Sequence, residues 1–164
     1  MNIDHILRTV NEHAVDCILA GGTNFMLNHA PILTFDVDLW ILDTDENRAR
    51  VSQAPVALQA EWGLNEKEWK PVGGAPDWLK QQNVYCLTSP HGAIDVFRQL
   101  RGLENQYEHC RRRALARNTA SGIPYVSLSD EDMLRCQETL DPADQKADRM
   151  RILREAIARR KQQP

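Results

Sequence analysis

The apolar residues of this chain follow two different spacings. Ile3, Ile6, Leu7 and Val10 recur at the spacing of one helix face, which predicts an amphipathic helix over residues 3–13. Helices are also predicted at 23–30, 43–63, 129–140 and 141–161, where start, stop or capping signals flank the segments. Short apolar runs predict strands at residues 15–22, 35–42, 83–89, 93–100 and 123–128.

Prolines, glycines and capping residues refine these boundaries. The strand over 15–22 should end in a tight turn at its two glycines, and Pro31 should close the helix that follows. Pro55 is expected to kink or split the helix over 43–63, and Pro142 should lie just inside the start of the terminal helix. Ser129 followed by Asp132 is a capping-box pattern. Residues 104–118 are expected to be part helix and part strand, and 63–82 the least regular segment.

Composition narrows the class of protein. The 164 residues are 42% hydrophobic and 26% charged, which are ordinary globular values. The mixture of helices and strands predicts one α+β domain over 1–164, with a C-terminal helical segment at about 129–160. A net charge of −3 argues against nucleic-acid binding through bulk charge.

The four cysteines and the lengths of the apolar runs indicate the cellular compartment of the protein. The cysteines form no C-x-x-C pair, which fits reduced thiols better than a zinc site or a disulfide framework. No apolar run approaches the length of a membrane span, and the first residues do not resemble a signal peptide. We therefore expect a cytoplasmic protein without membrane contact.

Two aspartates interrupt the apolar run at 35–42. Side chains alternate along a strand, so Asp36 and Asp38 share one face while Val37, Leu39 and Ile41 share the other. Two carboxylates at this spacing repel each other unless a cation lies between them. Hard divalent cations such as Mg²⁺ suit such an all-oxygen site, so the pattern predicts a metal site.

A third carboxylate and a glycine pair extend this hypothesis. Asp95 is the one charged residue within the apolar run AIDVF, and it joins the other two if its strand pairs beside residues 35–42. Gly21 and Gly22, at a turn leading into a helix, would let a phosphate approach backbone N–H groups. Together these features indicate phosphoryl-group chemistry with two metals, one activating a hydroxyl and one holding a triphosphate.

The segment GGTNFMLNHAPILTFDVDLWI resembles the signature of the polymerase-beta-like nucleotidyltransferases, and more narrowly that of small prokaryotic members, some of which act as toxins or phage-defence enzymes. The resemblance implies a nucleotidyltransferase-like mixed sheet with helices packed mainly on one face. It also implies metal ligands at Asp36, Asp38 and Asp95, binding two Mg²⁺ ions or Mn²⁺. Gly21, Gly22 and Thr23 match the glycine turn that holds the triphosphate, and Thr34 matches a threonine two residues before the acidic pair.

The similarity extends to the C-terminal segment, where Lys146 matches a motif lysine and is a candidate nucleotide ligand. The chain departs from the pattern at Ile32, where the family often has arginine, and at the helix after Ser129, where Arg135 is the nearest basic residue. Other basic groups must therefore hold the nucleotide phosphates if this chain binds them.

The expected reaction transfers a nucleoside monophosphate from an NTP to a hydroxyl acceptor, which is an RNA, a protein or a small molecule. The alternative is a non-catalytic protein of the same fold that binds nucleotide or a partner protein in a toxin–antitoxin or phage-defence system. A third possibility is structural, with the aspartates in buried ion pairs with arginines; for Asp95 the candidate partners are Arg98 and Arg101.

Several other residues have simpler explanations. Thr23 can cap the helix after the glycines as well as contact a phosphate. Trp62, Trp69 and Trp78 are expected to pack under the irregular segment, with base stacking as the alternative. His29 and His91 are expected in loops or at the surface. The basic run Arg111, Arg112, Arg113 and Arg117 is expected to be a solvated face, with RNA contact as its alternative function.

Overall fold

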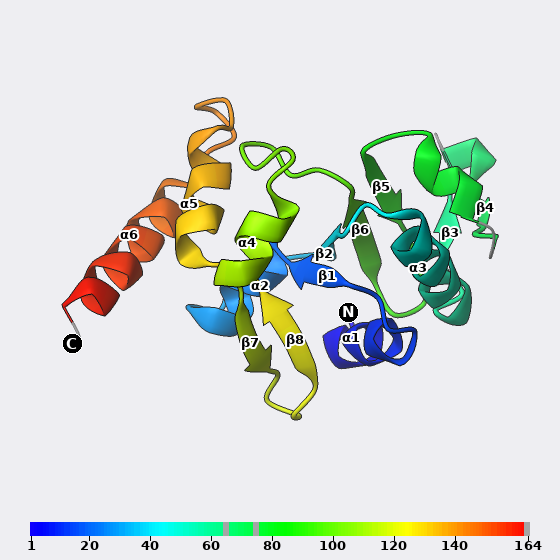
Figure 1. Cartoon of the computed structure of the whole chain (residues 1–164), viewed down its shortest axis with the longest axis horizontal. Helices are drawn as coiled ribbons and strands as arrows, with labels where there is room; N and C mark the ends of the chain where they lie inside the picture. Colours follow the sequence, from blue (N-terminus) through cyan, green and yellow to red (C-terminus); the bar gives the residue numbers. More distant parts are fainter. Residues whose placement is uncertain (64–65, 74–75, 163–164) are drawn as a thin grey trace.

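The computed structural model describes residues 1–63, 66–73 and 76–162. A six-stranded sheet runs through the centre of the molecule (Figure 1). Its strands are β1 (Cys17–Leu19), β2 (Asp36–Ile41), β5 (Val84–Leu87), β6 (Ala93–Phe97), β7 (Leu115–Asn118) and β8 (Pro124–Ser127). The α-helices are α1 (Ile3–Glu12), α2 (Gly21–Asn28), α3 (Asp45–Ala57), α4 (Tyr107–Arg113), α5 (Asp130–Glu138) and α6 (Ala147–Lys161).

The sheet is mixed, which confirms the predicted α+β class. Its strand order is β5-β6-β2-β1-β8-β7. The pairs β2–β6 and β1–β8 are parallel, and the other neighbours are antiparallel. β2, which carries the D-x-D pair, therefore lies directly beside β6, which carries Asp95, although α3 and the segment through β5 separate the two strands in the sequence.

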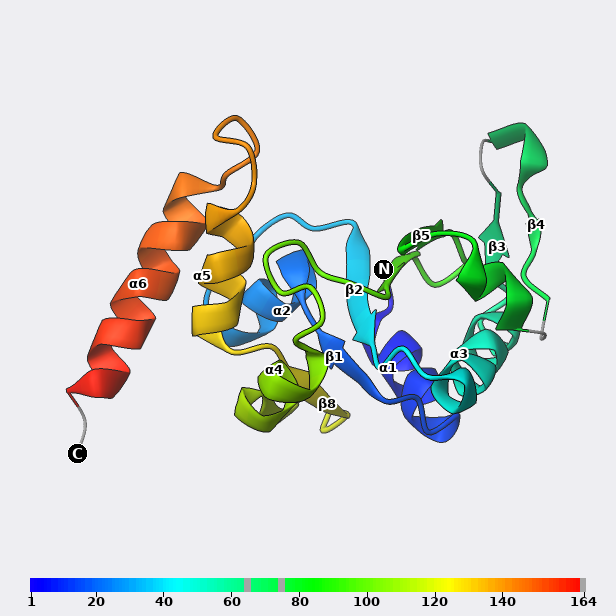
Figure 2. The ribbon, with the colours of Figure 1, turned by 45° about the horizontal axis from the view of Figure 1, so that its top comes forward.

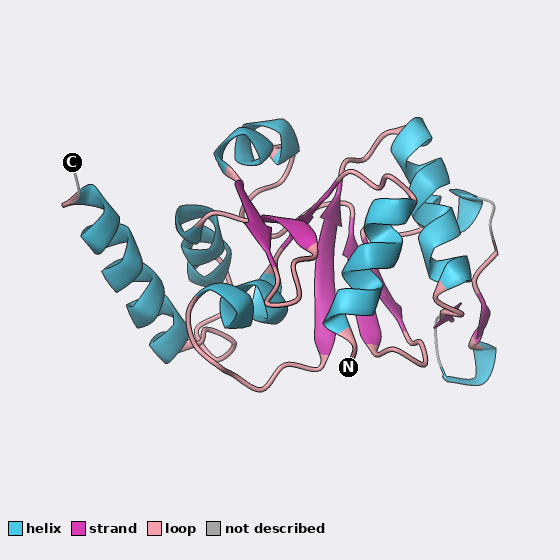
Figure 3. Cartoon of the chain, turned by 90° about the horizontal axis from the view of Figure 1, so that it is seen from below, coloured by secondary structure: helices cyan, strands magenta, loops and turns pink. Residues whose placement is uncertain are grey.

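Helices cover both faces of this sheet, rather than mainly one. The apolar side chains of β2 that point away from the aspartates pack with α1 and α3, around Leu39, Ile6 and Val51. The opposite face packs α2, α4, α5 and α6 around Trp40, where Phe25 and Leu153 are fully buried. Figure 3 shows α1 lying across the strands, and α6 lies at one end of the molecule in all three views (Figures 1, 2 and 3).

Two of the proline expectations are wrong. Pro55 does not split its helix: it lies in the last turn of α3, which ends shortly afterwards at Ala57. Pro142 precedes α6 by five residues: residues 141–144 form a turn, closed by Asp144 N–H donating to Asp141 O at 2.8 Å, and the helix begins at Ala147. The capping box is confirmed, since the Ser129 hydroxyl accepts from Asp132 N–H at 3.2 Å.

The segment over 63–82 is irregular, as expected, where the structure describes it. It holds the short strand β4 (Lys70–Pro71) and the 3₁₀ turns η1 (Glu66–Glu68) and η2 (Pro76–Lys80), and β4 pairs with β3 (Glu61–Trp62), which comes just before the segment. Trp62 and Trp78 pack on Tyr85, which confirms their structural role. Trp69 instead lines a shallow hollow beside Lys70 and Gln81. Within the described residues, none of the helices combines the length and the apolar character that crossing a bilayer requires.

Candidate nucleotide and metal site

Three carboxylates converge on one face of the sheet. Asp38 on β2 is the register partner of Asp95 on β6, and Asp36 lies one pleat away on the same face. One oxygen from each of the three lies within 4.8 Å of the others. The predicted convergence of Asp36, Asp38 and Asp95 is therefore confirmed as geometry. Carboxylate oxygens at this separation match the ligand chemistry of Mg²⁺ and Mn²⁺.

The glycine turn is built around Asp38. Gly21 has φ +57°, and a Cβ there would lie 1.9 Å from Asp38 Oδ2. The absence of a side chain lets the carboxylate sit against the start of α2, where Gly22 N–H donates to Asp38 Oδ2 at 3.2 Å. Gly22 is equally constrained, because a Cβ there would lie 2.5 Å from Thr34 Oγ1. Both glycines are thus explained by close packing of the acidic strand on the helix.

The electrostatics of the cluster are those of like charges held together. The pKa of Asp38 is raised to about 7, first by burial and then by the charges of Asp36 and Asp95, against the Gly22 hydrogen bond and the attraction of Arg149. Burial also raises the pKa of Asp95, opposed by a hydrogen bond from the Cys86 thiol. A divalent cation between these groups would remove the repulsion.

Thr23 and Thr34 hold the acidic strand by different contacts. Thr23 is fully buried, and its hydroxyl donates to the carbonyl oxygen of Asp36 at 2.6 Å. It is not the helix cap, because α2 begins after Ala20, whose side chain makes no capping bond. The Thr34 hydroxyl donates to Asp36 Oδ1 at 3.2 Å. The Thr23 side chain therefore orders the strand rather than pointing into open space.

The basic residue beside the carboxylates is Arg149, which the sequence analysis missed. Lys146 is the N-cap of α6 and exposed, and it lines neither of the two hollows that contain Asp38. Arg149, one helical turn further on, is half-buried and lies with its guanidinium carbon 5.3 Å from the Phe25 ring centroid. Burial lowers the pKa of Arg149, while Asp38 and Asp36 raise it. Arg149 follows Lys146 by three residues, so the two lie near each other on the helix surface, and this spacing could have indicated Arg149 as a second candidate.

Two hollows meet at Gly21, Asp38 and Arg149. The first, of about 320 Å³, is polar around the carboxylates and also has Gly22, Leu33, Thr34, Phe35 and Asp36 in its wall. The second, of about 260 Å³, is largely apolar and lies between the end of β6 and helices α5 and α6, with Phe97, Leu100, Leu128 and Met133 in its wall. Figure 2 shows α2 beside β2, with α5 and α6 further along the same side. A polar and an apolar compartment therefore adjoin at the carboxylates.

The ion-pair alternative for the aspartates is not what the structure shows. Arg98 binds Asp43 at 2.8 Å, and Arg101 lies 3.7 Å from Asp141. Among the residues that the structure describes, Asp36, Asp38 and Asp95 make no ion pair within 4.0 Å. The carboxylates are thus left uncompensated at short range, which a structural role would not require.

Two further expectations hold in part. The basic run is largely exposed, as expected, but Arg113 binds the buried Asp132 and Arg111 lies 3.5 Å from Asp16. His29 lies in the turn that ends α2, as expected of a loop residue, but it is half-buried and its Nε2 lies 2.8 Å from Asp130 Oδ1.

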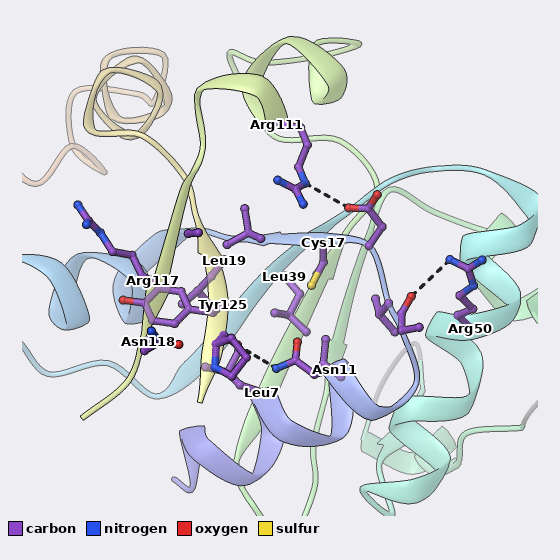
Figure 4. Close-up of a pocket in the computed structure, with 17 residues that line it drawn as sticks. Leu7, Asn11, Cys17, Leu19, Leu39, Arg50, Arg111, Arg117, Asn118 and Tyr125 are labelled. Atoms are coloured by element: carbon purple, nitrogen blue, oxygen red, sulfur yellow. Dashed lines mark hydrogen bonds and ion pairs between the residues drawn. The ribbon is translucent and has the colours of Figure 1, made fainter. Parts of the chain in front are cut away.

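A larger hollow of about 550 Å³ lies on the opposite face of the sheet, between α1, β1 and β8 (Figure 4). Leu19, Leu39 and the Cys17 thiol point into it. Two of the three arginines in its wall have partners within the chain, since Arg50 donates to the carbonyl oxygen of Ala14 at 3.4 Å and Arg111 lies beside Asp16. This hollow is larger than the two that contain Asp38, but the three carboxylates and Arg149 lie on the other face of the sheet.

Comparison with solved structures identifies proteins of similar fold. The chain is similar to the solved structures of the antibiotic-resistance factor ANT(2'')-Ia, an aminoglycoside nucleotidyltransferase of polymerase-beta-like type. Its solution structure matches with a TM-score of 0.52 at 13% identity, over 96% of this chain and 90% of that one. The crystal structure with adenylyl-2''-tobramycin matches with a TM-score of 0.55 at 13% identity, over 97% and 89%. No family model and no curated protein sequence matches the chain. The fold is nucleotidyltransferase-like.

Proposed function

We propose that this protein transfers a nucleoside monophosphate from an NTP to a hydroxyl acceptor. The observation that carries the proposal is the parallel register of Asp38 with Asp95, which brings three carboxylates together beside a glycine turn. In the reaction, the acceptor oxygen forms a bond to the α-phosphorus, the bond from that phosphorus to the bridging oxygen breaks, and pyrophosphate leaves. The hydroxyl proton passes to the Asp95 carboxylate or to solvent.

The residues of the chain would divide the work as follows. Asp36, Asp38 and Asp95 would hold two Mg²⁺ or Mn²⁺ ions, which when bound neutralise phosphate charge and activate a hydroxyl. Gly21 and Gly22 would admit the triphosphate to the start of α2. Ile32 packs against the apolar cluster and carries no charge, so Arg149 would provide the positive charge beside the triphosphate. The apolar hollow beside Met133 and Leu128 would receive the base.

The competing function is non-catalytic binding of nucleotide or of a partner protein, in a toxin–antitoxin or phage-defence setting. Ile32 favours it, because the family's arginine is missing there. The three intact aspartates oppose it, since binding without catalysis gives no reason to hold Asp36, Asp38 and Asp95 together.

The test is thermal stability of the purified protein with each of the four NTPs, with and without Mg²⁺. A ligand at about a hundred times its dissociation constant adds roughly 2.7 kcal/mol. We expect one or more NTPs to stabilise the wild type only with Mg²⁺, and Asp38→Asn to lose the effect. The exposed Asp77→Asn is the matched control and should keep it. No shift with any NTP or metal would reject the enzyme.

A further inference from the structure

The hollow between α1, β1 and β8 is not used by the proposed transfer (Figure 4). Leu19 of β1 and Leu39 of β2 face it, whereas the Asp38 side chain points to the opposite face of β2. A ligand in this hollow would therefore lie across the sheet from the carboxylates. Its volume of about 550 Å³ falls within the usual range of small-molecule sites.

The floor of this hollow is apolar. Four buried aliphatic side chains from α1 and the sheet form it: Leu7, Val10, Leu19 and Leu39. The ring of Tyr125, on β8, lines one side (Figure 4). The aliphatic side chains offer no hydrogen-bonding group, so the part of a ligand that contacts them must itself be apolar.

The wall of the hollow carries more positive than negative charge, although the whole chain has a net charge of −3. Its charged residues are three arginines and one aspartate: Arg50, Arg111, Arg117 and Asp16. Asp16 already has a partner, because its Oδ1 accepts from the Tyr107 hydroxyl at 2.7 Å. The hollow is therefore complementary to an anion rather than to a cation.

Two of the three arginines keep hydrogen-bond donors for a ligand. Arg111, in the last turn of α4, contacts Asp16 through Nε alone, at 3.5 Å, and its two terminal nitrogens have no partner among the described residues. The side chain of Arg117, on β7, makes no hydrogen bond or ion pair with any other residue that the structure describes. Arg50 is held by an ion pair and by a backbone carbonyl oxygen. Free guanidinium N–H groups match the oxygens of a carboxylate or a phosphate.

We infer that this hollow is a second ligand site, which binds an organic anion: Arg111 and Arg117 hold its carboxylate or phosphate group, and its apolar body lies on Leu19 and Leu39. The site goes beyond the proposed nucleotidyl transfer and does not depend on it. An uncharged compound of the same shape would leave the guanidinium groups without an acceptor, and a cationic compound would be repelled by them.

The test uses matched ligands in calorimetric titration, without NTP or metal. 2-Naphthoate and 2-naphthyl phosphate carry the two kinds of anion on the same ring system, 2-naphthamide is uncharged, and acetate lacks the ring. We expect at least one of the two ring-bearing anions to bind, and the amide and acetate to bind at least about 5-fold more weakly, since each lacks one of the two contacts. The tighter of the two anions shows which oxyanion the site takes. No binding by either anion, or equal binding by the amide or by acetate, would overturn the inference.

Arginine variants test the charged part of the site. Arg111→Gln and Arg117→Gln should each raise the Kd of the bound anion about 5- to 10-fold, as the loss of a partly exposed charge-assisted hydrogen bond predicts. Arg112→Gln is the matched control: Arg112 is exposed on α4 next to Arg111 but does not line the hollow. Arg117→Gln removes no side-chain contact within the described residues, so it should fold even if Arg111→Gln does not. A Kd unchanged in both hollow variants would overturn the inference.

Methyl NMR tests the apolar part of the site and its place in the molecule. On addition of the anion, the methyl signals of Leu19 and Leu39 should shift, because both side chains face the hollow. The methyl signals of Leu100 and Leu128, in the apolar hollow beside Asp38, should not shift. Shifts at Leu100 and Leu128 alone would overturn the inference, because they would place the anion on the carboxylate side of the sheet.

Discussion

The strands that carry the aspartates and the helices that close over them contribute to the site in different ways. On β2 and β6, each carboxylate is placed by alternation along the strand and by parallel register, so its direction follows from the local pattern. On α6, the residue that reaches the site is determined by how the helix docks on α2 and α5: Arg149 lies beside Asp38, whereas Lys146 is exposed at the helix start. The local sequence pattern places the three carboxylates on one face, and tertiary packing places the Arg149 guanidinium beside them.

The largest expected effect breaks the strand side of this comparison. Asp38→Asn should lower nucleotidyl transfer by about 10³-fold, because several kcal/mol of charge stabilisation depend on the metal site. The same substitution should stabilise the metal-free protein by about 1 to 2 kcal/mol, because it relieves repulsion from Asp36 and Asp95. Pyrophosphate release measures the loss of transfer, and denaturant unfolding without Mg²⁺ measures the gain in stability. Destabilisation of the metal-free variant would instead support a structural ion pair.

Gly21→Ala probes the packing of the acidic strand against α2. We expect a loss of about 2 to 4 kcal/mol of unfolding free energy, since the new methyl group overlaps the Asp38 carboxylate at a positive φ. Gly122→Ala separates the two causes, because Gly122 has φ +82° but no atom within 4 Å of the added Cβ, and it should cost about 1 kcal/mol. Equal losses for both variants would show that backbone strain alone explains Gly21.

The helix side is tested by two residues one turn apart. Arg149→Gln should raise the KM for the NTP by about 10- to 30-fold, as the loss of one charge-assisted phosphate contact predicts. Lys146→Gln should change it by less than about twofold, since an exposed lysine away from the hollows contributes little. The reverse ranking would return the phosphate contact to Lys146, and would mean that α6 rotates when the nucleotide binds.

The sequence predicted features that depend on neighbouring residues better than features that depend on contacts between distant segments. The strand spans, the D-x-D face, the third aspartate and the capping box at Ser129 follow from periodicity and short-range chemistry, and the structure bears them out. The glycine pair was expected at the turn, but its close contact with Asp38 was not visible, because it depends on two segments 16 residues apart. The division of helices between both sheet faces and the position of Arg149 depend on long-range packing, which the periodicity of apolar residues does not encode.

A smaller effect concerns pH, and it sharpens the account of the carboxylates. The pKa of Asp38 is about 7 in the folded protein and 3.8 as its unperturbed value, so between these pH values the folded state holds a proton that the unfolded state has lost. Stability of the metal-free protein should therefore decline as pH rises from about 4 to 7, and Asp38→Asn should flatten that profile.

Mg²⁺ must displace the same proton from Asp38, so the affinity for Mg²⁺ should fall about tenfold for each pH unit below 7. Calorimetric titration of Mg²⁺ at pH 6 and pH 8 measures this. An affinity independent of pH would mean that the ion binds without Asp38, and the cluster would then be two carboxylates with a bystander rather than a three-ligand site.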